Sequence, residues 1–189
     1  MNGMRKIKRL AVPPYGFAQG LEVGARHFLA QCGEFWKFEP GEIIVNEGEH
    51  HSSLFMVIDG KLTQRRQGDD GTVVEFRPIK RGRSFGEVNL FHPVGARATI
   101  VAATSGELWR IDRTQIDAVM DHDPQIARKL MTWLCTQLAR RLRRADDRYI
   151  TTKSEYNHLS DLMEDAETSD EEPASDEDNP LIEDESAET

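Results

Sequence analysis

The residues with the clearest chemistry lie between Ser84 and Ile100, in the sequence SFGEVNLFHPVGARATI. Gly86 permits a positive φ at the start of a short helix, and the first backbone N–H groups of that helix would form an anion site. Arg97 adds a planar guanidinium with a permanent charge. Glu87 would repel an anion, but its carboxylate is a good acceptor for sugar hydroxyls. Together they suit a small molecule with a phosphate and a ribose; a structural ion pair between Glu87 and Arg97 is the alternative.

The elements that must position these residues are short strands. From Phe35 to Ile111, apolar or β-branched runs recur about every ten residues and are separated by turn residues, including an Asp70-Gly71 hairpin signal. Strands at this spacing predict an antiparallel barrel or sandwich and not a parallel α/β sheet. The expected strands cover residues 43–45, 54–58, 62–66, 72–77, 98–103 and 107–111.

Helical periodicity follows the strands. Asp112 is expected to cap a helix that runs through Met120. Asp123-Pro124 is a strong helix start, because proline favours the first helical position, and the helix is expected to run to about Tyr149. A short leading helix is predicted within residues 17–33. The apolar stripe of the long helix consists of Ile126, Leu130, Trp133, Leu134, Leu138 and Leu142.

Charge divides the chain into a basic and an acidic part. The whole chain carries −9, yet residues 161–189 contain 14 Asp or Glu and no Lys or Arg, so the remainder is net basic. Such an acidic segment predicts a disordered tail, which either solvates the protein or covers a basic surface. The basic surface lies at the end of the long helix. It is either a solvated helix end or a binding site for a polyanion or for the tail itself. It comprises Arg140, Arg141, Arg143, Arg144 and Arg148.

The order of these features resembles the cyclic nucleotide-binding domain family, which includes the bacterial catabolite activator proteins and the regulatory subunits of cAMP-dependent kinase. The family's phosphate-binding cassette is similar to Phe85-Gly86-Glu87 followed by a short helix and Arg97-Ala98-Thr99-Ile100. The resemblance covers about residues 20–148. It implies a mainly β fold with flanking helices, namely an eight-stranded antiparallel double-stranded β-helix (a jelly-roll-like β-roll) followed by a long C-terminal helix.

The resemblance also implies a division of the chain and a role for each cassette residue. Gly86 and the backbone of Glu87 and Val88 would line the cyclic phosphate and ribose, and the Glu87 carboxylate would accept from the 2′-hydroxyl. Arg97 would pair with the phosphate, and the backbone N–H of Ala98 would donate to it. The implied site residues are Phe85, Gly86, Glu87, Val88, Arg97, Ala98 and Thr99. The implied parts are an N-terminal extension (1–19), the β-roll with its flanking helices (20–122), a long lid or dimer helix (123–150) and an acidic disordered tail (151–189).

The function that we expect is that of a cyclic nucleotide receptor that couples ligand binding to movement of its C-terminal helix. The resemblance implies cAMP or cGMP as the ligand; relatives tuned to cGMP tend to have threonine directly after this arginine, so its absence after Arg97 favours cAMP. No nucleophile–base pair, metal cluster or kinase signature is found, so we expect a regulatory protein in signal transduction and not an enzyme. The 124–149 helix is the expected surface for a homodimer or another protein partner. The alternative is a nucleotide-independent β-roll scaffold that uses its helix and acidic tail for interactions.

Composition limits the remaining classes. No apolar run approaches the roughly 18 residues that a membrane helix needs, and the basic N-terminus meets Pro13-Pro14 without the apolar region of a signal peptide. Two cysteines cannot form a disulfide framework, and His50-His51 is expected to be a polar turn and not a metal site. No helix-turn-helix unit follows Arg148, so sequence-specific DNA binding is not expected. We therefore expect a cytoplasmic protein without a metal, a cofactor or a membrane contact.

Overall fold

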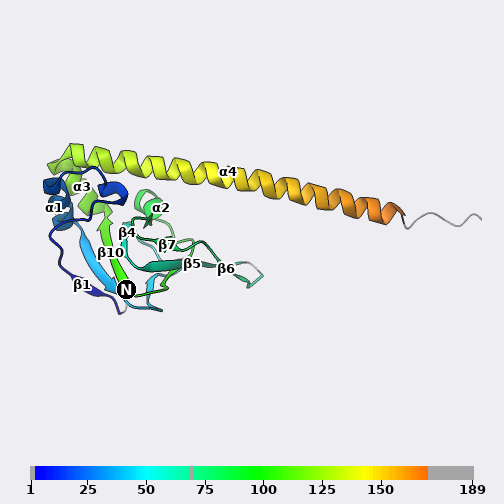
Figure 1. The fold of residues 1–189 in the computed structure, drawn as a ribbon, viewed down its shortest axis with the longest axis horizontal. Helices are drawn as coiled ribbons and strands as arrows, with labels where there is room; N and C mark the ends of the chain where they lie inside the picture. Colours follow the sequence, from blue (N-terminus) through cyan, green and yellow to red (C-terminus); the bar gives the residue numbers. More distant parts are fainter. Residues whose placement is uncertain (1–2, 69, 170–189) are drawn as a thin grey trace, which may run out of the picture. The chain divides into compact units, whose positions relative to one another are not determined.

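The computed structural model describes residues 3–68 and 70–169 (Figure 1). The chain divides into two compact units, Met1–Leu138 and Ala139–Thr189. Among the described residues, the first unit contains all of the strands and the second contains the later part of the last helix. None of the helices in the described ranges has an apolar stretch long enough to cross a bilayer.

Two antiparallel sheets form the β part of the first unit. One has the strand order β1-β2-β10-β4-β8, and the other has the order β3-β9-β5-β6, with β7 paired to β5. The mainly β, antiparallel fold expected from the sequence is confirmed, with ten strands in the described residues where the resemblance implied eight. The strands are β1 (Arg5–Ile7), β2 (Glu34–Phe38), β3 (Ile43–Val45), β4 (Ser53–Asp59), β5 (Lys61–Gln67), β6 (Val73–Glu75), β7 (Ile79–Lys80), β8 (Ser84–Phe85), β9 (Thr99–Ala102) and β10 (Gly106–Asp112).

Strand β4 connects two hydrophobic clusters. Its side chains alternate between the two faces of the sheet, as in any strand. Leu54, Met56 and Ile58 join a cluster that includes helical residues, whereas Phe55 and Val57 join a cluster between the two sheets. Because both faces are covered, the strand reads as a continuous apolar run instead of an alternating one.

Helices α3 and α4 begin where the sequence predicts their caps. Helix α3 (Arg113–His122) starts with a capping box, in which the Asp112 carboxylate accepts from the backbone N–H of Gln115. Helix α4 (Pro124–Ser169) starts at Asp123, whose carboxylate accepts from the backbone N–H groups of Gln125 and Ile126. The short helix α2 (Glu87–Phe91) lies in the predicted cassette.

The leading helix predicted within residues 17–33 is two separate elements. These are a 3-10 helix, η1 (Gly16–Ala18), and helix α1 (Val23–Cys32). Gly20 separates them with a φ of 81°, a left-handed conformation that a right-handed helix does not contain.

The N-terminal segment is part of the folded unit and not a separate extension. Strand β1 pairs antiparallel with β2. Val12, Phe17 and Ala18 are buried in the same cluster as Trp109. The division expected at residue 19 therefore differs from the structure, because apolar side chains on both sides of it pack into one core.

Helix α4 is also longer than the sequence analysis predicted. It continues through residues 150–169, whereas we expected its end near Tyr149 and a disordered tail from residue 151. No glycine or proline occurs between Pro124 and Pro173 to end the helix. Acidic composition alone was a poor guide to the helix end. The remaining part of the expected tail, residues 170–189, lies outside the described residues.

Candidate functional site

Gly86 has the left-handed conformation that the sequence predicts. Its φ is 83° and its ψ is 0°, and it is the N-cap residue of α2. Strand β8 pairs with β4 immediately before this turn. A Cβ atom at Gly86 would lie 2.3 Å from the carbonyl oxygen of Ser53. Only glycine fits, because the turn needs a positive φ and the backbone approaches β4 closely.

The residues on either side of Gly86 are held by the core. The Phe85 ring stacks on that of Phe55, with 4.7 Å between the centroids. Glu87 is 1% exposed, although charged side chains are almost never fully buried unless they are paired. Val88, the next residue, is half exposed. The first turn of α2 therefore places a carboxylate inside the protein and an apolar side chain at its surface.

The second half of the predicted site lies at the start of β9. Arg97 is exposed and Ala98 is buried. Thr99 is the first residue of β9, and its hydroxyl accepts from the backbone N–H of Glu47 at 3.1 Å. Ala96 exchanges backbone hydrogen bonds with residues 48 and 49, at 2.8 and 2.9 Å. The segment around Glu47 thus fixes the backbone that carries Arg97.

Residues 47–51 interact with both halves of the predicted site. His50 forms an isolated antiparallel bridge with Gly95 in the second half. In the first half, the His51 Cε1 would lie 3.3 Å from a Cβ atom at Gly86. The His51 ring also meets the edge of Phe55, with 5.7 Å between centroids. The two halves, distant in sequence, are therefore both attached to one short loop.

The sequence analysis did not identify His51 as a site residue, because it interpreted His50-His51 as a polar turn. Its Nδ1 accepts from the backbone N–H of Ser53 at 3.2 Å. Burial lowers the pKa of His51, opposed by the nearby Glu49 carboxylate and assisted by Arg110. No signal in the sequence alone identifies this histidine as a neighbour of Gly86.

Asn89 holds the connection between the two halves. It is buried on α2, and its side-chain amide donates to the carbonyl of Val94 at 2.5 Å. This bond ties the loop after α2 back to the helix. Asn89 was not among the predicted site residues, because an asparagine in a short helix has no distinctive pattern.

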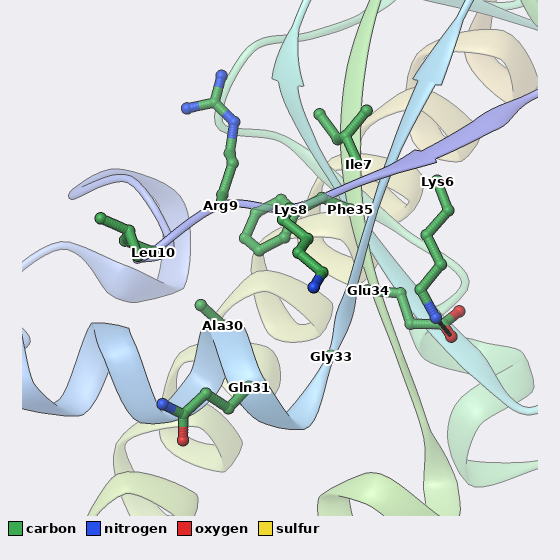
Figure 2. Close-up of a pocket in the computed structure, with 10 residues that line it drawn as sticks. All are labelled: Lys6, Ile7, Lys8, Arg9, Leu10, Ala30, Gln31, Gly33, Glu34 and Phe35. Atoms are coloured by element: carbon green, nitrogen blue, oxygen red, sulfur yellow. Dashed lines mark hydrogen bonds and ion pairs between the residues drawn. The ribbon is translucent and has the colours of Figure 1, made fainter.

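A pocket of about 480 Å³ lies elsewhere in the first unit (Figure 2). It is lined by residues of β1, β2 and the end of α1, and it contains none of the predicted site residues. The Lys6 amine at its edge is paired with Glu34 at 2.6 Å, and Arg9 is bound to Glu107. The cassette and this pocket are therefore separate features.

Comparisons with known proteins agree with the fold. The family model "Cyclic nucleotide-binding domain" matches residues 35–123. A solved cyclic nucleotide-binding domain from Methylobacillus flagellatus KT has a TM-score of 0.63 at 16% identity, covering 68% of this chain and 72% of that one. At that identity the likeness is one of fold.

Two curated relatives match at the level of sequence. A CRP-like cAMP-activated global transcriptional regulator of Mycobacterium tuberculosis is 27% identical over 148 residues, covering 78% of this chain and 60% of the relative. A cGMP-dependent protein kinase of Plasmodium berghei is 32% identical over 92 residues, covering 49% of this chain and 10% of the kinase. The chain thus spans less than two thirds of either relative.

The fold is that of a β-roll like those of solved cyclic nucleotide-binding domains. Over residues 35–123 the chain matches the model of the cyclic nucleotide-binding domain family.

Proposed function

We propose that this protein is a regulatory receptor that binds a cyclic mononucleotide at the cassette, cAMP in preference to cGMP. One observation carries the proposal: Gly86, at a φ of 83°, opens a short helix whose first residue is a carboxylate with 1% exposure. A helix start with an enclosed carboxylate suits a ligand that combines an anion with hydroxyls. The family match over residues 35–123 supports this assignment.

Each site residue has a role in this proposal. The backbone N–H groups at the start of α2 and the guanidinium of Arg97 bind the cyclic phosphate. The Glu87 carboxylate accepts from the ribose 2′-hydroxyl, and the backbone N–H of Ala98 donates to the phosphate. Phe85 and Thr99 hold the backbone on either side, and Val88 lies at the rim.

The preference for cAMP rests on Ala98, which follows Arg97 where relatives tuned to cGMP tend to have threonine. The two curated relatives are described one as cAMP-activated and the other as cGMP-dependent. A direct comparison of the two nucleotides is therefore part of the test.

Coupling to the C-terminal helix is supported by the core. Leu90 of the cassette helix belongs to the same hydrophobic cluster as Leu130 and Leu134 of α4. Interiors are close-packed, so a shift of α2 on ligand binding must be accommodated by its neighbours in the cluster. We propose that the ligand biases the position of this first part of α4.

The remaining parts of the proposal concern partners and location. The protein acts without catalysis and in the cytoplasm, and the 124–149 part of α4 contacts a second copy or another protein. Sequence-specific DNA binding is not part of this function. The alternative is a scaffold that keeps the β-roll and needs no nucleotide.

Isothermal titration of nucleotide-free protein with cAMP and with cGMP tests the proposal. About 22 non-hydrogen atoms at roughly 0.3 kcal/mol each give a Kd on the order of 10 μM. Arg97→Ala should weaken binding by about 2–5 kcal/mol, because the phosphate loses its countercharge. Arg5→Ala, which removes an exposed arginine from β1, is the matched control. Heat from neither nucleotide would favour the scaffold.

A further inference from the structure

The second unit contains a row of exposed apolar side chains at a spacing of seven residues. Leu142, Tyr149, Tyr156 and Met163 are each between 64% and 70% exposed. Large apolar residues in such a row are unusual on a solvated helix. A seven-residue repeat is the spacing at which one helix meets another along a coiled-coil seam.

A second row completes the seam. Ala145, Thr152 and Leu159 follow members of the first row by three residues, and all three are exposed. In heptad notation the first row occupies position a and the second row position d. The stripe is narrow, as expected for contact with one partner helix and not for burial in a globular core.

Charge along the same helix is divided. Residues 140–148 contain five arginines and two aspartates, whereas residues 154–167 contain five acidic residues and no Lys or Arg. Arg148 and Asp161 are separated by about 20 Å along a continuous helix. The acidic turns therefore cannot fold back onto the arginines of their own helix. A second helix in the opposite direction brings them together.

From this pattern we propose that residues 142–163 of α4 pair with the same segment of a second copy of the chain as an antiparallel two-stranded coiled coil. The pairing needs no nucleotide, so it stands apart from the proposed ligand site. It also places the dimer contact mostly beyond the 124–149 segment.

The sizes of the side chains favour the antiparallel direction. In that arrangement Leu142 lies opposite Leu159 of the second copy, Tyr149 opposite Thr152, and Tyr156 opposite Ala145. Each tyrosine then faces a small residue, and each layer has a similar volume. In the parallel arrangement each residue meets its own copy, so the bulky tyrosine layers alternate with much smaller alanine and threonine layers. Even layers pack with fewer voids.

The flanking charges favour the same direction. Antiparallel helices pair position g with g and position e with e. Arg148 would then face Glu155 of the second copy, and Asp146 would face Lys153. Parallel helices would instead bring Arg148 against Lys153, which is a like-charge contact. Lys153 lies 5.4 Å from the Tyr156 ring in its own helix, on the side of the seam where it would meet Asp146.

Cysteine cross-linking of the full chain tests the direction. Cys32 and Cys135 are free, so both are first replaced by serine, and Leu142→Cys and Leu159→Cys are made separately. In a glutathione redox buffer, an equimolar mixture should form a disulfide between the two variants, and neither variant alone should do so. Positions 142 and 159 are about 25 Å apart along the helix, far beyond disulfide reach. Disulfides within each single variant, or none in any sample, would overturn the proposal.

Charge reversal gives an independent measure. By sedimentation equilibrium of the full chain at low salt without nucleotide, Arg148→Glu should weaken self-association about tenfold. The double variant Arg148→Glu/Glu155→Arg should restore it. Arg144→Glu makes the same charge change at an outward position and should leave it unchanged. Stronger association of Arg148→Glu, or a monomeric parent protein, would contradict the antiparallel pair; nucleotide titration of the same samples is read separately.

Discussion

The aromatic ring of Phe85 stacks on that of Phe55, with their centroids 4.7 Å apart and their planes inclined by 5°. Phe55 lies on β4, the strand that contributes side chains to both hydrophobic clusters. The stack thus attaches the start of the cassette directly to the core. The positions of Gly86 and Glu87 depend on this packing as well as on local turn geometry.

Loss of the stack should therefore affect both stability and binding. Phe85→Ala removes a buried ring and is expected to cost about 3–5 kcal/mol of unfolding free energy, measured by urea denaturation. Phe85→Leu keeps most of the volume and should cost less. Cyclic nucleotide affinity should fall more for the alanine variant. Equal losses of stability in the two variants would contradict a specific role for the ring.

The close approach of Gly86 to β4 can be tested by comparison with a glycine that has a similar backbone conformation. Gly86 and Gly41 have φ values of 83° and 85°, but an added Cβ meets the Ser53 carbonyl only at Gly86. Gly41→Ala should cost about 1–2 kcal/mol from backbone strain alone. Gly86→Ala should cost more in thermal or urea unfolding and should also impair nucleotide binding. If the two variants lose the same stability, the close approach to β4 is unimportant.

The pKa of His51 predicts a pH-dependent stability. Burial lowers this pKa from its ordinary value of 6.5, so the unfolded chain takes up the proton first as pH falls. The stabilising contribution is complete above the unfolded pKa and is lost as pH falls through the folded pKa. Unfolding free energy measured from pH 8 to pH 5 should therefore decline below about 6.5.

The matched variant is His51→Gln, which should flatten that decline. His92→Gln removes an exposed imidazole from the same cassette and controls for the loss of one titratable group. A decline of unchanged steepness in His51→Gln would assign the pH dependence to other residues.

Much of the fold follows from local sequence signals. The apolar run at 54–58 and the Asp112 and Asp123 caps are each determined by neighbours within a few residues, and the structure contains them. Strand β1 was not predicted, because its sequence Arg-Lys-Ile carries no strand pattern and its pairing with β2 is a long-range contact. The contact of His51 with Gly86 was missed for the same reason.

The sequence left two roles open for the acidic segment, which either solvates the protein or covers a basic surface. The sequence suggested that an acidic tail screens Arg140–Arg148, yet residues 161–169 continue the same helix. Screening by these residues must then come from a second chain. The acidic residues from 170 onward lie outside the described residues. Truncation of the chain can separate their effect on the arginines from that of residues 161–169.

Two truncated proteins should bind heparin differently. Ending the chain at Ser160 removes every acidic residue of the 161–189 segment, whereas ending it at Ser169 keeps the helix and its acidic last turns. In the antiparallel pair those turns lie near the arginines of the second copy, so the Ser160 protein should be retained most strongly on heparin at low salt. Dissolved salt at 0.1 M largely screens interactions between exposed charges more than about 10 Å apart, and higher salt screens them further. The difference in heparin retention should therefore shrink as the salt concentration rises. Equal retention of the full chain and the Ser160 protein would show that no acidic segment covers Arg140–Arg148.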